Sequence, residues 1–240
     1  IGQAHLVGQN GVFRKFLETG NVPSFILWGP PGVGKTTLAK IVATTLKRPF
    51  YTLSAVTSGV KEVREVLESA RKQKFFDSKP PILFIDEIHR FNKSQQDSLL
   101  GAVEQGTVTL IGATTRSGLL TSPLRARFGI QCHLEYYDAP VLAGIVRRSA
   151  RILDVSIDDD AAHEVALRSR GTPRIANALL RRVRDFAMVK GEGHIDLGIT
   201  RIGLSALNID SRGLDQMDNK ILGTIIEKFG GGPVGLNTIA

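Results

Sequence analysis

The stretch SFILWGPPGVGKTTLAKIVATTL (24–46) decides the fold of this chain. Its opening residues FILW are apolar and β-prone, which predicts a short buried strand. The next residues, GPPGVGKTT (29–37), match the spacing G-x-x-x-x-G-K-[ST], and the apolar residues after them predict a helix. A glycine-rich loop between a strand and a helix turns its backbone N–H groups toward phosphate oxygens. The stretch therefore predicts an α/β fold built around a phosphate-binding loop.

The same loop predicts the ligand. Lys35 supplies a positive charge to the β- and γ-phosphates of a nucleotide, and the Thr36 hydroxyl suits Mg²⁺. We therefore expect ATP and Mg²⁺ as cofactors, with nucleotide contacts from Gly32, Gly34, Lys35, Thr36 and Thr37.

A second apolar run, ILFIDE (82–87), ends in two acidic residues. Ligands of open α/β sheets bind at the carboxyl ends of the strands, which makes Asp86 the second predicted Mg²⁺ ligand. Glu87 is expected to orient and polarise the attacking water. Thr115, at the end of IGATT (111–115), is placed to hydrogen-bond the γ-phosphate or that water, although threonine at a strand end is also ordinary β-structure.

Strands and helices alternate along residues 1–137, which predicts a parallel sheet with helices on both faces. Apolar residues at helical spacing, as in 60–70 and 99–103, mark the helices. This region is the expected P-loop large domain, with strands at FILW (25–28), FYTLSA (50–55), ILFID (82–86), VTLIGAT (108–114) and IQCHLEY (130–136).

After Asp138 the strand pattern stops, and stripes of apolar residues predict a small helical domain over 138–208. Residues 208–213 have the composition of a linker, and Asp215 is placed to cap a further helix. We expect 209–240 to hold this linker and the opening of a third module. The absence of an initial methionine indicates a fragment.

Bulk composition limits the partners. Hydrophobic residues make up 42% of the 240 residues, enough for a buried core, yet no apolar run approaches the roughly 20 residues of a membrane span. A net charge of +8 favours a polyanionic partner, nucleic acid first. The lone cysteine, Cys132, excludes an internal disulfide and favours a cytoplasmic location. No residue cluster has zinc spacing.

Two arginines, Arg125 and Arg127, lie in LTSPLRARFG (120–129), after the strand that ends at Thr115. An arginine supplied by a neighbouring subunit can stabilise the transition state of phosphoryl transfer. A finger of this kind requires a ring or a filament of subunits. Solvated surface arginines are the alternative interpretation of the pair.

A third arginine, Arg174, is predicted in the first turn of a helix that Thr172 and Pro173 begin. A cation at this position opposes the helix dipole, which suggests an anionic partner such as the chain's own ATP. An exposed arginine without a partner is the alternative.

Residues 86–89 spell DEIH, which also fits a DExH helicase pattern. Helicases of that type carry a second RecA-like lobe, and the helical region after Asp138 does not provide one. We therefore interpret His89 as a turn residue.

Taken in this order, the motifs resemble the AAA+ ATPases. The segments RSGLLTSPLRARFGI (116–130), RSRGTPRIANALLRRVRDFA (168–187) and GLDQMDNKILGTIIEKFGGGPVGL (213–236) closely resemble the RuvB family of Holliday junction branch-migration ATPases. The resemblance implies a helical lid at 138–208, a winged-helix DNA-binding domain that begins near Leu214, and a ring of subunits, expected as a hexamer.

The resemblance to RuvB also implies roles for single residues. Thr115 is then the sensor 1 residue, and Arg127 is the finger that completes a neighbouring subunit's site. Arg174 is the sensor 2 residue, and Tyr137 lies beside the nucleotide. Arg125 receives no catalytic part.

The N-terminal part resembles a different family. The segments SFILWGPPGVGKTTLA (24–39), YTLSAVTSGVKEVRE (51–65) and FIDEIHRFNKSQQDSLLGAVEQGTVTLIGATT (84–115) are similar to RarA, a replication-associated recombination ATPase of the clamp-loader branch. RuvB proteins usually carry a β-hairpin insert before sensor 1, which docks RuvA, and AVEQGTVTLIG (102–112) leaves no room for one. We therefore expect a chimera joined near GATTRSG (112–118), in which RuvA docking is doubtful.

These features favour an ATP-dependent DNA motor of recombination and repair, RuvB-like, that works as a ring and contacts the DNA backbone without sequence preference. Two alternatives remain open. One is a RarA-like ATPase that acts at stalled replication forks. The other is a nucleotide-gated DNA-binding or loader subunit without translocation.

Overall fold

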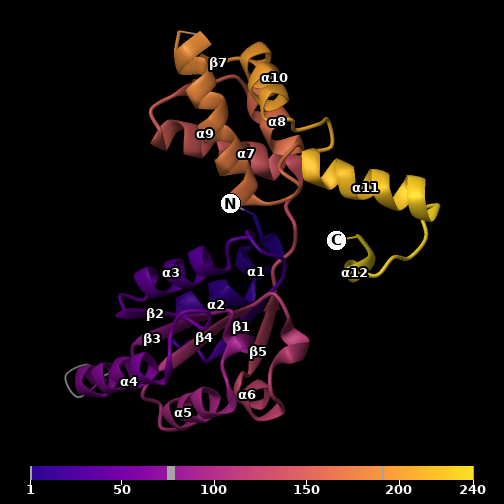
Figure 1. Ribbon diagram of the computed structural model, residues 1–240. Coiled ribbons are helices and arrows are strands. Elements are labelled where there is room, and N and C mark those ends of the chain that lie inside the picture. The colour runs from indigo at the N-terminus through magenta and orange to yellow at the C-terminus, as the bar shows by residue number, and fades with distance from the viewer. Residues whose placement is uncertain (1, 75–78, 191, 240) are drawn as a thin grey trace. The chain divides into compact units, whose positions relative to one another are not determined.

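A five-stranded parallel sheet forms the centre of the N-terminal part of the chain in the computed structural model (Figure 1). The structure describes residues 2–74, 79–190 and 192–239, which divide into two units, 2–135 and 136–240. The predicted parallel sheet is confirmed, with strand order β2-β3-β4-β1-β5. The strands are β1 (Phe25–Trp28), β2 (Phe50–Ser54), β3 (Ile82–Asp86), β4 (Thr109–Thr114) and β5 (Ile130–His133).

Helices cover both faces of this sheet because side chains alternate between its faces and both sets are apolar. On one face, α2 (Val12–Thr19) and α3 (Lys35–Thr45) pack, and the rings of Phe13 and Phe25 lie 5.1 Å apart edge to face. The other face buries a cluster that includes Ile26, Leu83, Ile85 and Leu110 of the strands with Val63 and Leu67 of α4 (Val60–Lys74) and Leu99 of α5 (Lys93–Glu104).

The segment between β3 and β4 has no room for an extra hairpin, as the sequence predicted. Residues 87–108, all of which the structure describes, form the short 3₁₀ turn η1 (Ile88–Arg90), the helix α5 and a tight turn. Asn92 begins α5 with a capping box, in which its side chain accepts from the backbone of Gln95 and the Gln95 side chain accepts in return. The chain therefore passes directly from α5 into β4.

The second unit is mainly helical, with α7 (Ala139–Ile152), α8 (Asp159–Leu167), α9 (Pro173–Lys190) and α10 (Leu197–Ala206) around a shared apolar core. Asp138 and Asp196 cap α7 and α10 by accepting backbone N–H groups. The predicted all-helical character needs one correction, since β6 (Ser156–Ile157) pairs in parallel with β7 (His194–Ile195). Strands of two residues are too short for a periodic pattern to reveal.

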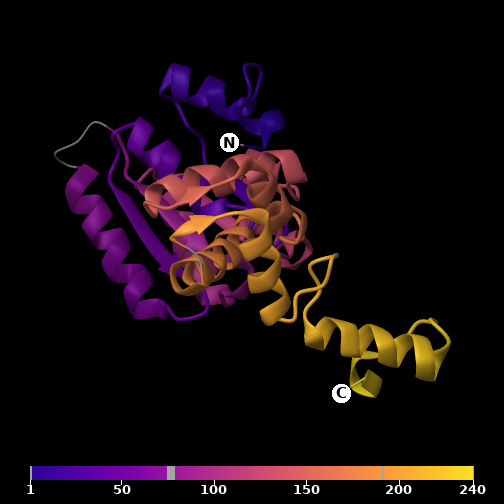
Figure 2. The ribbon, with the colours of Figure 1, turned by 90° about the horizontal axis from the view of Figure 1, so that it is seen from above.

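The last helices of the chain are α11 (Gln216–Phe229) and α12 (Leu236–Ile239). Asp215 caps α11 as predicted, because its side chain accepts the backbone N–H of Asp218 in a capping box. In two views, α11 extends away from the helices α7–α10 (Figure 1, Figure 2). Its apolar side chains are largely exposed, namely Met217, Ile221, Leu222, Ile226 and Phe229.

Within the described residues, none of the helices has the length and apolar character needed to cross a membrane.

Candidate functional site

The phosphate-binding loop follows β1 at the carboxyl edge of the sheet and leads into α3. Lys35, the first residue of α3, is buried, and its Nζ donates to the carbonyl oxygens of Gly29 and Pro30 at 2.8 Å each. Gly34 precedes the helix with a φ of 100°, a left-handed conformation that favours glycine. The ammonium group is thus held inside the loop, where phosphate oxygens would meet it.

Gly29 is held between the end of β4 and the residue that follows β5. Its backbone N–H donates to the Thr114 carbonyl at 3.3 Å, and its φ is +143°. A Cβ atom added here would lie 2.2 Å from the carbonyl oxygen of Leu134, far inside any real contact. The residue must therefore be glycine if the loop is to keep this path.

Substitution of Gly29 tests this packing. Gly29→Ala is expected to lower the free energy of unfolding by roughly 1–3 kcal/mol and to weaken ATP binding, because the loop must move away from Leu134. Gly101→Ala is the matched control: an added Cβ on α5 meets nothing within 4 Å, and alanine in a helix is expected to stabilise by about 0.5–1 kcal/mol. Urea unfolding and nucleotide titration measure both; wild-type behaviour of Gly29→Ala would contradict the packing argument.

The acidic residues end β3, which lies next to β4 in the sheet. Asp86 is half-buried, and one of its carboxylate oxygens accepts the backbone N–H of Glu87 at 3.1 Å. Glu87 has a φ of 51°, a left-handed conformation that is uncommon for a side chain of this kind and often occurs at functional sites. This backbone turns the Glu87 side chain toward the end of β4.

Thr115 lies beside Glu87, where the strand order brings the ends of β3 and β4 together. Its hydroxyl donates to Glu87 Oε2 at 3.1 Å, and its backbone N–H lies 3.4 Å from the same oxygen. Two residues that are 28 positions apart in sequence therefore form one polar pair at the carboxyl edge.

His89 belongs to the same group, although the sequence analysis treated it as a turn residue. It lies in η1, but its side chain turns inward: Nδ1 is 2.8 Å from Thr114 Oγ1 and 3.2 Å from Glu87 Oε2. His89 lies three positions after Asp86, so the DEIH pattern was the available signal for its place. Spacing alone could not show which way the ring points.

The donor chemistry of the loop and of β3 fits Mg²⁺. Thr36 and Thr37 follow Lys35 in the first turn of α3, and α3 packs against β3 and β4. The Thr36 hydroxyl and the Asp86 carboxylate are hard oxygen donors. Mg²⁺ is typically held by one or two such protein groups together with phosphate oxygens and water.

Arg127 lies near the amino ends of the strands, opposite to the carboxyl ends that carry the phosphate loop and the acidic pair. It ends α6 (Ser122–Arg127), three residues before β5 begins, and its guanidinium pairs with the Glu104 carboxylate at the end of α5. The phosphate loop follows the end of β1. Strand β1 runs parallel to β5, and their first residues, Phe25 and Ile130, are paired. Four residues of strand span about 13 Å, so Arg127 and its own phosphate loop lie at opposite ends of these strands.

Arg125 has a different environment from Arg127. Its Nη2 donates to the carbonyl of Leu120 at 3.1 Å and lies 3.4 and 3.5 Å from those of Ser117 and Gly118. The guanidinium therefore closes the turn before α6. These contacts account for the position of the side chain without any anion.

Tyr137 lies against the turn that precedes α9, the helix that carries Arg174. The backbone N–H of Tyr137 donates to the Gly171 carbonyl at 2.8 Å, and Arg174 is exposed in the first turn of α9. Gly171 has a φ of +71°, and an added Cβ would lie 2.8 Å from the Tyr136 side chain. The start of α9 is thus docked on the segment that carries Tyr137.

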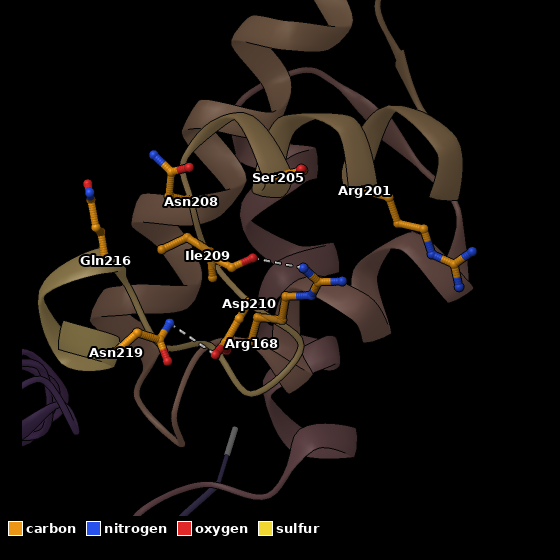
Figure 3. Close-up of a pocket in the computed structure, with 8 residues that line it drawn as sticks. All are labelled: Arg168, Arg201, Ser205, Asn208, Ile209, Asp210, Gln216 and Asn219. Atoms are coloured by element: carbon orange, nitrogen blue, oxygen red, sulfur yellow. Dashed lines mark hydrogen bonds between the residues drawn. The ribbon is translucent and has the colours of Figure 1, made fainter. Parts of the chain in front are cut away.

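A separate open cleft of about 630 Å³ lies where the lid helices meet residues 208–219 (Figure 3). Three of its lining residues, Arg168, Asp210 and Asn219, make polar contacts within this part of the chain. Arg168 binds the Glu164 carboxylate and donates to the Ile209 carbonyl at 3.0 Å, and Asn219 donates to Asp210 at 3.2 Å. These contacts hold the linker to the lid.

Nucleotide hydrolases of the AAA class carry their phosphate-binding and acidic groups at the carboxyl ends of strands in one parallel sheet, and in the first unit these strands, β1 and β3, flank β4. The model of the "ATPase family associated with various cellular activities (AAA)" matches residues 25–136. The chain is therefore an ATPase of the AAA class.

The family models that match the rest of the chain identify its family. Residues 137–210 match the "RuvB AAA lid domain", and residues 211–240 match the "RuvB C-terminal winged helix domain". Taken with the relatives below, these matches show that the chain belongs to the RuvB family.

The relatives include the "Holliday junction branch migration complex subunit RuvB" of Parabacteroides distasonis, 54% identical over 236 residues that cover 90% of this chain and 67% of that protein. The subunit of the same name from Christiangramia forsetii is 51% identical over 233 residues, covering 88% and 66%. The chain thus spans about two thirds of the length of these relatives. The solved Thermotoga maritima RuvB Holliday junction branch migration motor is 43% identical with a TM-score of 0.87, covering 100% of this chain and 81% of that chain.

The interpretation of the chain as a chimera is not supported. RuvB relatives match about nine tenths of the chain, so their similarity extends far into the region that was assigned to a RarA-like parent. The phosphate loop and the acidic strand are common to AAA+ cores, which explains why motifs there suggested RarA. The direct passage from α5 into β4 is therefore a feature of this RuvB-family chain.

Proposed function

We propose that this chain is the ATP-driven motor subunit of Holliday junction branch migration. The observation that carries the proposal is the match of RuvB-type lid and winged-helix models to the residues that follow an AAA domain. We divide the chain by function at the expected boundaries: an ATPase domain at 1–137, a lid at 138–208 and a DNA-binding module that opens within 209–240.

In this proposal the phosphate loop binds ATP. The backbone of Gly32 and Gly34 and the ammonium group of Lys35 hold the phosphates, with Thr37 beside them. Thr36 and Asp86 would hold Mg²⁺, which neutralises charge on the phosphate oxygens when it is bound. The buried position of Lys35 supports its role, since an ammonium group inside the loop is already close to its target.

Glu87 is the proposed base. It orients the attacking water and polarises it, and Thr115 fixes the carboxylate from the neighbouring strand. Phosphoryl transfer depends on such positioning and on electrostatic stabilisation more than on covalent chemistry.

Subunits of a ring are proposed to share their sites. Arg127 would act on the ATP of an adjacent copy, which its distance from its own phosphate loop supports. Arg174 and Tyr137 would contact the nucleotide from the lid, so that hydrolysis changes the lid's angle. We propose a hexamer, as the family resemblance implies.

DNA is the proposed substrate of the motion. With a net charge of +8, the protein is expected to bind the phosphate backbone with little sequence preference. The absence of a hairpin within residues 87–108 leaves RuvA docking at this place outside the proposal. We place the protein in the cytoplasm: Cys132 is free and buried, and burial raises the pKa of its thiol to about 11.

The test of the function is movement of a synthetic four-way junction. The protein is expected to convert the junction into two duplexes in an ATP-dependent reaction, and Lys35→Ala is expected to abolish the conversion. ATP-dependent binding to the junction without any conversion would contradict the motor and support a nucleotide-gated loader. A pull-down with RuvA tests the docking statement separately, because capture of the chain would contradict it.

A further inference from the structure

The side chain of His89 is enclosed between the ends of β3 and β4, with 7% of it exposed. Its Nδ1 atom lies 2.8 Å from Thr114 Oγ1 and 3.2 Å from Glu87 Oε2. The phosphate, metal and finger roles proposed above do not involve this histidine. Its burial beside the proposed base therefore requires its own explanation.

The charge state of the ring limits what it can do. Burial lowers the pKa of His89, while the Glu87 carboxylate opposes this effect, so the imidazole is neutral near pH 7. A neutral imidazole carries a single N–H. With that hydrogen on Nδ1, the N–H lies between two acceptors, Thr114 Oγ1 and Glu87 Oε2, and is shared by them. With it on Nε2, Nδ1 accepts from the Thr114 hydroxyl and turns a lone pair toward the carboxylate.

Glu87 uses one oxygen for all of these contacts. Oε2 accepts the Thr115 hydroxyl at 3.1 Å and lies 3.4 Å from the Thr115 backbone N–H, in addition to the His89 contact. The second oxygen, Oε1, takes no part in these three contacts. A carboxylate that is anchored through one oxygen has little freedom to rotate, so it presents the other oxygen in a single direction.

We propose that His89 is a positioning residue for Glu87, whose Nδ1–H holds Oε2 so that Oε1 faces the attacking water. The inference rests on the proposed function, because it takes Glu87 as the residue that polarises that water. In this tautomer Thr114 Oγ1 also accepts from Nδ1–H, at 2.8 Å, so the end of β4 holds the ring while the ring holds the carboxylate.

Steady-state ATPase kinetics of His89 variants test the proposal. His89→Leu removes both ring nitrogens, so kcat is expected to fall roughly 10- to 100-fold while KM for ATP stays within about twofold. His89→Asn returns an N–H group close to Nδ1 and is expected to restore most of kcat. His163→Leu, on an exposed position of α8, is the matched control and should behave as the wild type. If His89→Leu fails to fold, His89→Phe carries the same expectation.

The same His89 substitution made in Glu87→Gln protein separates an effect on the position of Glu87 from damage to the fold. In Glu87→Gln protein, His89→Leu is expected to lower the residual rate no further, because its effect passes through Glu87. Equal losses in both backgrounds, an unchanged kcat, or a raised KM alone would overturn the proposal. Wild-type hydrolysis by Glu87→Gln would instead refute the assignment of the base in the proposed function, and the role of His89 with it.

Discussion

Arg127→Ala is expected to lower kcat for ATP hydrolysis by the assembled protein by about 10³- to 10⁵-fold, with little change in ATP affinity. The guanidinium stabilises charge that develops on the transferred phosphoryl group, so its loss acts on the transition state more than on ground-state binding. In the isolated chain Arg127 pairs with Glu104, and both side chains are about half exposed. An exposed pair of this kind contributes little, so Arg127 can leave Glu104 for a neighbour's phosphate at small cost.

Mixing two inactive variants shows whether the arginine acts between subunits. Arg127→Ala protein keeps its own base, and Glu87→Gln protein keeps its finger, so a mixed ring contains intact interfaces and is expected to regain ATPase activity. Arg125→Ala is the control on the same helix, because Arg125 contacts only carbonyl groups of the preceding turn among the described residues. Failure to regain activity in any proportion would contradict a finger supplied in trans.

Glu87→Gln is expected to lower kcat by about 10²- to 10⁴-fold while ATP still binds, since the amide keeps the shape of the side chain but accepts protons poorly. The Thr115 hydroxyl can still donate to the amide oxygen, so the local structure should persist. Single-turnover hydrolysis and nucleotide titration separate the two effects.

The control for Glu87→Gln is Glu65→Gln on the exposed face of α4. Glu65 makes a long pair with Lys61 at 3.8 Å, and its loss should leave both kcat and ATP affinity near the wild-type values. A Glu87→Gln protein that loses ATP binding as well would show that this carboxylate supports the fold of the site, and would argue against its role as the base.

Much of the fold could be predicted because its signals are local. The runs at 25–28 and 82–86 are short, apolar and bounded by turns, and they match β1 and β3 residue for residue. The strand at 130–136 was predicted too long, because LEY continues the apolar pattern after the last paired residue, His133. The pair β6 and β7 escaped notice, since two residues define no period.

The site was predictable to the extent that its residues sit inside motifs. The phosphate loop and the Asp86–Glu87 pair carry their own context of strand and turn. The partners of Arg125 and Arg127 could not be predicted, because two positions on a helix separated by about 200° point to different neighbours, and only packing supplies those neighbours. His89 does lie in a turn, as predicted, but the inward direction of its ring could not be predicted for the same reason.

The sequence by itself determined the α/β class, the phosphate loop and its ligand chemistry, since these depend on residue types at fixed spacing. The tertiary structure alone decided that Thr114 and Thr115 meet His89 and Glu87, and that Arg127 faces Glu104 at the opposite edge. Both results follow from the order β3-β4-β1-β5, which places strand ends that are distant in sequence side by side. Strand order comes from the packing of the whole sheet, and no local pattern encodes it.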